Sequence, residues 1–387
     1  MGGAAALAER LCIAAREADW RGADPYDALW WNGWPQAIVR HRRGRQLLIQ
    51  LHARAPVNVR PLYRRSDPQI SKTLALFGAA AARLELQQLA RDALDRLAAD
   101  ATTGTPGFGY PFPVQTRWSF YDADTPNAIA TSFGALALSE GARRFDRPNW
   151  AARAESAAAW ALDALWSEQQ GWFVYHPSSR ALVHNANLLV ARLVAQTLGL
   201  DERVARAVRQ TLAAQNADGT FPYGAGPGLE WVDSFHTAYV LECLGGLLET
   251  DAGVGAALRR GTSAYLARFF GPAGEARLWP DRAYPEDGHS AGTALTTLGS
   301  LAARGFVEPS SIEPIARRVA THVVRGAHAV HRRHRRWSTR VAYPRWCDAH
   351  VALGLASYAV MTAGSAASTT RSPSLVRSSA AEGSPTR

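Results

Sequence analysis

The sequence predicts an all-α fold, an (α/α)6 toroid of helical hairpins with long, aromatic-rich loops on one rim. Short polar clusters centred on Ser132, His184, His236 and His289 follow one another at intervals of 52, 52 and 53 residues. An Ala- and Leu-rich stretch of helical period follows each cluster, and the alternation typical of strands is nearly absent. Because a fixed period of this length is typical of repeat architectures, we expect two helices and one loop in each repeat.

The hairpins can be assigned along the chain. Residues 4–19 are predicted to form an amphipathic helix, and residues 20–73 a Trp- and Arg-rich irregular lead-in packed on the ring. The toroid is predicted over 74–363, beginning with the apolar stretch Leu74–Ala99. It contains five clear hairpins, and a sixth forms if the N-terminal helix pairs with the last one. From Gly364 the chain is rich in Ser, Ala, Thr and Pro, which predicts a disordered tail.

Composition narrows the class of protein. The 387 residues are 47% hydrophobic and 20% charged, as in ordinary soluble domains. Three scattered cysteines form no metal-type pair and fit a reducing compartment. No apolar run approaches the roughly 20 residues that a membrane span needs. We therefore expect a cytoplasmic protein without a metal or other cofactor.

The net charge of +10 comes mostly from arginine, which is concentrated in residues 40–45 and 331–336. Such clusters are either solvated loop tips or attract an anionic partner. No nucleic-acid-binding motif accompanies them, so nucleic acid is the least expected partner. Peripheral contact of these basic clusters with an anionic membrane, at the inner face of the cell membrane, is the remaining alternative.

One sequence element resembles a known class of toroids. Gln215-Asn216-Ala217-Asp218-Gly219-Thr220-Phe221 is similar to the Gln-x-x-Asp-Gly-x-Trp element of terpene-cyclase-type rings, with a degenerate copy at Gln169–Trp172. In that class the element ties an outer helix to the next loop, so the resemblance implies a ring. Asp122-Ala123-Asp124-Thr125 resembles the acid motif of such cyclases but lacks the third aspartate. An enzyme acting on an isoprenoid or lipid-linked substrate is therefore an alternative function.

Residues 24–346 also resemble a bacterial family of six-hairpin, glycosidase-like toroids associated with exopolysaccharide biosynthesis. The matching stretches are Asp24–Leu29, Pro56–Pro61, Val183–Leu188, Trp231–Thr237 and Tyr284–Ser290. The resemblance implies a carbohydrate context and a saccharide or lipid-linked saccharide substrate. It supplies no catalytic motif.

Asp233 is the first candidate for catalysis, because it lies between Trp231 and Phe235 just before an inner helix. Aromatic surroundings raise a carboxyl pKa toward general-acid use, whereas a helix start favours the anion. The competing interpretation is a helix cap. Glycoside hydrolysis needs a second carboxylate, for which Asp122, Asp124 and Asp287 are candidates.

His184, His236 and His289 are predicted at equivalent ring positions, and histidine transfers protons near neutral pH. Two facing imidazoles would suit proton removal and return at a sugar carbon, as in an epimerase. Buried structural histidines are the alternative interpretation, and a metal site is the least expected one.

Predicted substrate contacts complete the rim. Asn185 and Asn187, with Tyr223 or Arg345, are candidates to hold a uronate carboxylate for β-elimination. Aromatic side chains that stack on sugar rings are expected at Trp118, Tyr121, Trp231, Tyr284 and Trp346. Asp24, Asp27 and Arg60 form turns, or contact substrate if the lead-in crosses the ring mouth.

These observations favour a carbohydrate-active protein of bacterial surface-polysaccharide biosynthesis or modification. Acid–base chemistry on a sugar at the toroid mouth is expected, of hydrolase, epimerase or lyase type. A terpene-cyclase-like enzyme and a non-catalytic glycan-binding or scaffold protein are the alternatives.

Overall fold

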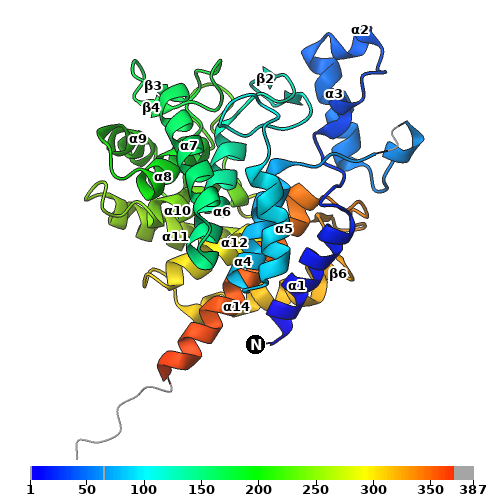
Figure 1. The fold of residues 1–387 in the computed structure, drawn as a ribbon. Coiled ribbons are helices and arrows are strands. Elements are labelled where there is room, and N and C mark those ends of the chain that lie inside the picture. The colour runs from blue at the N-terminus through cyan, green and yellow to red at the C-terminus, as the bar shows by residue number, and fades with distance from the viewer. Residues whose placement is uncertain (1, 64–65, 370–387) are drawn as a thin grey trace, which may run out of the picture.

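Six inner helices form a closed ring in the computed structural model, which describes residues 2–63 and 66–369 (Figure 1). Each inner helix contacts the next, and the last contacts the first, which closes the ring. These helices are α4 (Ser71–Arg83), α6 (Ala128–Phe145), α8 (His184–Thr197), α10 (Ser234–Gly245), α12 (Gly288–Ala302) and α14 (Ala349–Thr369). The prediction of an all-α (α/α)6 toroid is confirmed.

An outer helix packs against each inner helix. The outer helices are α5 (Gln87–Ala98), α7 (Pro148–Ala164), α9 (Glu202–Leu212), α11 (Val254–Phe269), α13 (Glu313–Arg318) and α1 (Gly2–Glu17). Helix α13 is short and passes into a π-helical turn at Val319–Val323. Helix α1 packs on α14, so the first and last helices of the chain together make the sixth hairpin.

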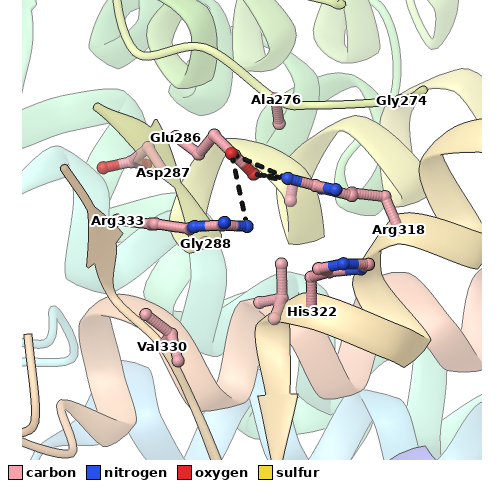
Figure 2. A pocket seen from close by; sticks show the side chains of 11 residues that line it. Gly274, Ala276, Glu286, Asp287, Gly288, Arg318, His322, Val330 and Arg333 are labelled. Atoms are coloured by element: carbon pink, nitrogen blue, oxygen red, sulfur yellow. Dashed lines mark hydrogen bonds and ion pairs between the residues drawn. The ribbon is translucent and has the colours of Figure 1, made fainter. Parts of the chain in front are cut away.

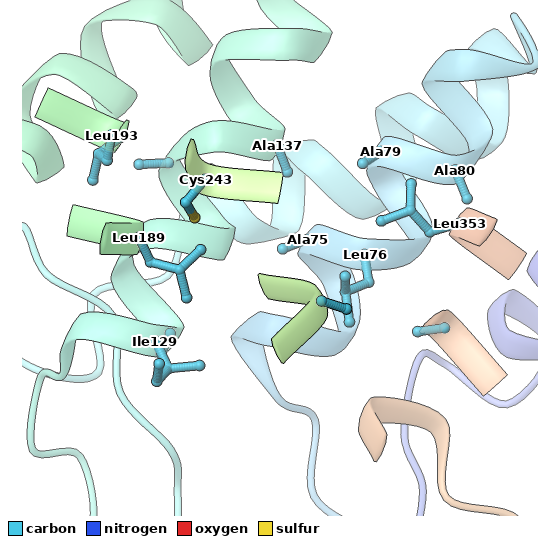
Figure 3. Close-up of a cluster of buried hydrophobic side chains, with 14 of the residues drawn as sticks. Ala75, Leu76, Ala79, Ala80, Ile129, Ala137, Leu189, Leu193, Cys243 and Leu353 are labelled. Carbon is cyan, nitrogen blue, oxygen red and sulfur yellow. The ribbon is translucent and has the colours of Figure 1, made fainter. Parts of the chain in front are cut away.

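Small side chains allow the inner helices to approach closely. Figure 3 shows alanines and leucines from α4, α6, α8 and α14 gathered with Cys243 of α10 in one cluster. Where α12 meets α14, a Cβ added at Gly354 would lie 2.3 Å from the carbonyl oxygen of Gly292. Glycine at this crossing is therefore a packing requirement of the ring.

The apolar stretch Leu74–Ala99 is two antiparallel helices rather than one. Helix α4 ends at Arg83, and Glu85 takes a positive φ of 59° before α5 begins at Gln87. That left-handed residue reverses the chain direction. The hydrophobic period alone does not mark this turn, because both helices carry apolar residues up to it.

The lead-in is more regular than the sequence predicts. It contains the 3-10 turn η1 (Asp27–Trp30), the short helix α2 (Gln36–Val39), the 13-residue helix α3 (Arg42–Arg54) and the 3-10 turn η2 (Arg60–Leu62). Leu48, Ile49 and His52 of α3 are buried, and Leu48 and Ile49 pack with Ala28 and Leu29. The arginines and Gly44 in its first turn conceal this helix in the sequence.

In the described part of the chain, four short antiparallel strand pairs brace the loops. They are β1 (Val114–Gln115) with β2 (Phe120–Tyr121), β3 (Trp166–Ser167) with β4 (Trp172–Phe173), β5 (Glu286–Asp287) with β8 (Arg332–Arg333), and β6 (Val324–Arg325) with β7 (His328–Ala329). A π-helical turn, η5 (Pro344–Asp348), leads into α14. Helix α14 continues past Gly364, and the rest of the predicted disordered tail lies outside the described residues.

Among the described residues, no helix combines the length and the apolar character that crossing a bilayer would demand.

Candidate functional site

Polar side chains cap three of the inner helices where the loops enter the ring. Asn127 accepts a hydrogen bond from the Ala130 N–H, Asp233 from the His236 N–H, and Asp287 from the Ser290 N–H. Each cap satisfies a backbone donor that the helix itself leaves unpaired. The polar clusters found in the sequence are thus, in the first place, the starts of inner helices.

A cavity of about 810 Å³ opens among these loops. Its volume falls within the range of small-molecule sites. Aromatic side chains dominate its wall, namely Tyr26, Tyr110, Trp118, Tyr121, Tyr175, Tyr223, Trp231, Phe235, Trp279, Trp337 and Trp346. Such a wall suits the stacking of pyranose rings.

Asp233 and His236 form a hydrogen-bonded pair at the cavity wall. His236 Nδ1 lies 3.0 Å and 2.8 Å from the two carboxylate oxygens of Asp233, and the Trp231 indole N–H donates to the same carboxylate at 3.3 Å. A carboxylate can only accept, so Nδ1 carries the proton, and the neutral imidazole keeps its lone pair on Nε2. The His236 side chain is 22% exposed, which leaves it reachable from the cavity.

A second imidazole, His331, lies in the same wall. The residue is 1% exposed, and neither ring nitrogen has a hydrogen-bond partner among the described residues. Its ring meets Tyr343 edge-on, with ring centroids 5.2 Å apart. Burial, with a smaller contribution from Arg332, holds the pKa of His331 well below its usual range, so the ring is neutral at pH 7. An unpaired buried imidazole costs free energy that a bound ligand can recover.

The charged part of the wall is unbalanced. Asp233 is the one carboxylate among the described lining residues, against four arginines: Arg54, Arg117, Arg332 and Arg345. Asp287 pairs with Arg332 at 3.1 Å, and Asp24 pairs with Arg345 at 2.5 Å. No ion pair joins Arg54 or Arg117 to a carboxylate in the described part of the chain. These two guanidinium groups remain available to an anionic ligand.

Several of the predicted aromatic contacts are brought together at the wall. Tyr223 stacks on Trp231 with ring centroids 4.2 Å apart, and its hydroxyl accepts a hydrogen bond from the Trp118 indole at 3.3 Å. Arg117 lies over the Trp231 ring at 4.9 Å. Tyr121 and Trp346 also line the cavity, and the structure shows no hydrogen bond from the Trp346 indole N–H to any described residue. Tyr284 is 44% exposed and lies outside the lining set.

His184 and His289 do not line the cavity. His184 is fully buried, with Nδ1 3.2 Å from the Thr211 hydroxyl, and burial lowers its pKa to about 4. His289 stacks between Phe235 and His350, at centroid distances of 4.3 Å and 4.2 Å. Its Nε2 lies 2.7 Å from the Tyr239 hydroxyl. Both histidines occupy structural positions inside the ring.

The other predicted polar residues of the helix starts also lie away from the cavity. Asp122 is exposed outside the lining set, and Asp287 is buried as a cap and ion-pair partner. The Asn187 side chain accepts from the Phe173 N–H and donates to the Ala207 carbonyl and the Thr211 hydroxyl, which ties α8 to strand β4 and to α9. Asn185 is buried in the first turn of α8, and its side-chain oxygen accepts no hydrogen bond from the described part of the chain.

The predicted lead-in contacts are buried ion pairs. Arg60 Nε lies 2.8 Å and 2.9 Å from the Asp27 carboxylate, and Arg60 Nη2 donates to the Asp24 carbonyl at 2.6 Å. Asp24 receives Arg345 through two further bonds. The lead-in does reach the ring mouth, but Pro25, Tyr26 and α3 make the contacts with the cavity.

The sequence analysis missed part of the wall. Gln46, Ile49, Gln50, Ala53 and Arg54 come from α3, and His331, Arg332, His334 and Trp337 come from the loop around β8. Both basic clusters named from composition therefore adjoin the cavity. The signal for α3 is the apolar spacing within Leu47–His52, and for His331 no sequence signal distinguishes it from its basic neighbours.

A smaller hollow beside Asp287 and Gly288 has a different character (Figure 2). Glu286 pairs there with Arg318 at 2.8 Å and with Arg333 at 3.7 Å. Its volume is about 10 Å³, which is about the space that one water molecule needs. We assign it to the packing of the β5 and β8 strands rather than to substrate binding.

The described residues contain no group of three or more His, Cys, Asp or Glu side chains arranged to hold a metal ion.

Fold and cavity together define an (α/α)6 toroid with an aromatic cavity at the starts of its inner helices. No family model and no curated protein matches the sequence. Among solved structures, the chain is similar to a cellobiose 2-epimerase from Bacillus thermoamylovorans, with a TM-score of 0.58 and 13% identity over 74% of this chain and 86% of the other.

Two further solved structures have the same fold. One is an unsaturated glucuronyl hydrolase specific for heparin, with a TM-score of 0.56 and 11% identity over 76% of this chain and 86% of that one. The other is a polysaccharide lyase, with a TM-score of 0.54 and 10% identity over 77% and 91%. At these identities the similarity establishes the shared fold.

Proposed function

We propose that the protein is a carbohydrate-active enzyme that moves a proton at a sugar carbon, with His236 as the base. The observation that carries this proposal is the Asp233–His236 pair at the wall of an aromatic cavity that also contains His331. Asp233 fixes the tautomer of His236 and stabilises the imidazolium that forms, as a buried carboxylate does for a catalytic histidine. The sugar-acting proteins of the same fold support the choice of substrate class.

The proposed step begins with a C–H bond next to a carbonyl or carboxyl group. His236 Nε2 takes the proton, and the C–H electron pair moves onto the neighbouring oxygen to form an enolate. In an epimerase, a proton returns to the opposite face of the carbon, and His331 is the second imidazole in the wall that could return it. Because the pKa of His331 is lowered, the ring is neutral at pH 7 and must first take a proton from solvent, which the charged ring holds weakly and gives up to the carbon. His236 later releases the abstracted proton to solvent, which balances this uptake.

Glycoside hydrolysis by two carboxylates is less well supported. That reaction requires an acid and a nucleophile or base, both carboxyl groups, on either side of the bond. Asp233 is the single carboxylate among the described lining residues, and Asp122 and Asp287 lie outside that set. The terpene-cyclase-like alternative loses support for the same reason, because its acid motif contains Asp122.

A lyase-type elimination is the second candidate, and the unpaired Arg54 and Arg117 favour it. There the substrate is a uronate, and an arginine neutralises the carboxylate next to the C–H bond. After His236 takes the proton, the electron pair forms a carbon–carbon double bond and the glycosidic oxygen leaves with its bonding pair. We further propose that the enzyme acts in bacterial surface-polysaccharide metabolism, on the basis of the sequence resemblance of residues 24–346.

The test is solvent exchange in deuterium oxide. Cellobiose and a disaccharide of glucuronate and glucose serve as probes, and the recovered sugars are examined by NMR and mass spectrometry. An epimerase places one deuterium at C2 of the reducing sugar, and a lyase yields an unsaturated uronate. His236→Gln should abolish either product, and His331→Gln should slow the epimerase reaction. Binding of either probe without exchange or elimination would instead identify a glycan-binding protein.

A further inference from the structure

The segment 28–63, here called the arm, has an unusual charge distribution. Residues 28–63 contain no Asp or Glu and six arginines, at positions 40, 42, 43, 45, 54 and 60, of which Arg60 is buried in the ion pair with Asp27. In Figure 1 the arm helices α2 and α3 project beyond the ring at the upper right, beside the loop that carries β2. The arm is thus a basic projection at the cavity side of the molecule.

Helix α3 in the arm has three distinct faces. Leu48, Ile49 and His52 are buried, whereas Gln46, Gln50, Ala53 and Arg54 line the cavity together with Ile49. Leu47 and Leu51, one turn apart, are 60% and 59% exposed. Because residues four apart share a side of a helix, these two leucines form an outward stripe, and the exposed Arg43, one turn before Leu47, extends that stripe.

Other apolar side chains of the arm are exposed as well. Ile38 is 37% exposed, Val57 50% and Leu62 86%. Arg40, Arg42 and Arg43 of the arm are exposed as well. A single exposed leucine needs no explanation, but five large apolar residues among unpaired arginines on one projection indicate a surface that is covered in use.

We propose that the arm binds the surface of an anionic phospholipid membrane. Leu47 and Leu51 enter the boundary between headgroups and acyl chains, and the arginines contact the lipid phosphates. An amphipathic helix with leucines on one side and flanking arginines has the chemistry that such a surface selects. The inference does not depend on the proposed reaction.

Two other occupants fit these observations less well. Nucleic acid would use the arginines but gain nothing from the exposed leucines, since its affinity comes from phosphate contacts. A second copy of the chain would bring one acid-free, arginine-rich arm against another in a two-fold contact, with like charges opposed. A membrane uses both components of the arm at once.

Membrane binding through α3 has a geometric consequence for the cavity. The helix that lies on the membrane also supplies Gln46, Gln50 and Ala53 to the cavity wall. A helix with its side chains is about 10 Å across, so the cavity mouth would lie about that far from the lipid headgroups. Saccharides displayed at the membrane surface would then be within reach of the cavity.

The experiment measures co-sedimentation of the full chain with two kinds of vesicle. We expect binding to vesicles of phosphatidylcholine mixed with phosphatidylglycerol, and about tenfold weaker binding to phosphatidylcholine alone. Raising the salt from about 0.1 M to about 1 M shortens the screening length from about 10 Å to about 3 Å and should weaken binding to the mixed vesicles. The double variant Leu47→Glu/Leu51→Glu should lose about tenfold or more of that binding.

A matched control is available outside the arm. Leu198 and Leu200, between α8 and α9, are 44% and 61% exposed, and Leu198→Glu/Leu200→Glu should bind vesicles as the wild type does. Equal vesicle binding by the wild type and the Leu47/Leu51 variant would overturn the proposal. So would a solution dimer, seen by light scattering, that this variant dissociates, or tighter binding to duplex DNA than to the mixed vesicles. Exchange into soluble disaccharides needs no vesicle, so failure here leaves the proposed reaction untouched.

Discussion

Helices α10 and α12 start in nearly the same way, yet only α10 presents its histidine to the cavity. In each, an aspartate cap accepts the N–H of the third residue that follows, at 3.0 Å from His236 N to Asp233 and 2.8 Å from Ser290 N to Asp287. His236 is that third residue, whereas His289 is the second residue after its cap. One residue turns a side chain by about 100° around a helix.

The consequence is a difference in role. His236 is hydrogen-bonded to its cap, Asp233, and lines the cavity, while His289 turns inward to stack on Phe235 and His350. The repeat period aligns the two histidines to within one residue, and that residue separates a candidate base from a structural group. The position of a histidine relative to its helix cap therefore predicts its role better than the spacing between repeats does.

The largest expected effect comes from breaking the α10 pair with Asp233→Asn. Asparagine caps a helix as well as aspartate does, so the fold should persist. The neutral amide stabilises no imidazolium, and turnover in the exchange assay should fall by about 10³-fold. Asp201→Asn, at the cap of outer helix α9, is the control and should retain full turnover. Asp233→Asn activity within tenfold of wild type would contradict the role given to this carboxylate.

A second effect concerns the stability of the protein at acid pH, to which the buried His184 of α8 contributes. Burial lowers the pKa of His184 to about 4, below the usual 6.5, so the unfolded chain binds more protons between these values. Stability from this group is complete above pH 6.5 and is lost as the pH falls toward 4, by at most about 3 kcal/mol. Urea unfolding of wild type and His184→Gln at several pH values measures the difference. Parallel pH profiles would show that His184 does not contribute.

The third effect sharpens the comparison between α10 and α12. His289→Gln removes a ring that stacks on two neighbours and meets the Tyr239 hydroxyl. It should lower the free energy of unfolding by about 1–3 kcal/mol, with turnover changed less than tenfold. His236→Gln should do the reverse, with little change in unfolding and loss of turnover. Equal losses of turnover in both variants would place His289 in the reaction.

The smallest expected effect is that of Arg117. Its guanidinium lies over Trp231 and has no carboxylate partner among the described residues. Arg117→Ala should weaken binding of the glucuronate-containing disaccharide about fivefold, and that of cellobiose less, because an exposed charge contributes about 1 kcal/mol. Calorimetry on both sugars gives the ratio. Arg336→Ala is an exposed control outside the cavity wall and should leave both affinities unchanged.

The sequence was sufficient for the ring because its evidence is local and repeated. A polar cap begins three of the six inner helices, α6, α10 and α12. Aromatic residues of the loops that lead into inner helices, such as Trp118 before α6 and Trp231 before α10, lie at the cavity wall. Candidate residues of this kind can be read from position along the repeat.

The rest of the site depends on contacts between distant segments. Asp24 and Arg345 are 321 residues apart in the sequence and form an ion pair. The sequence suggests both side chains as substrate contacts, but in the structure they bind each other. His331 reaches the wall because the loop around β8 folds over the mouth, and α3 does so because the lead-in docks beside β1. No period or motif encodes such docking, since it arises from the packing of whole segments.

Closure of the ring by its final helix has a consequence for synthesis of the protein. Helix α14 contacts both α12 and α4, and Arg83 of α4 reaches Ser357 across 274 residues. Until α14 leaves the ribosome, the earlier helices can form only an open arc with two uncovered apolar flanks, the kind of intermediate that chaperones bind. Arg345 and Trp346 directly precede α14, so the nascent chain completes its cavity at nearly the same moment as its ring. An interrupted translation product would therefore be both inactive and prone to aggregate.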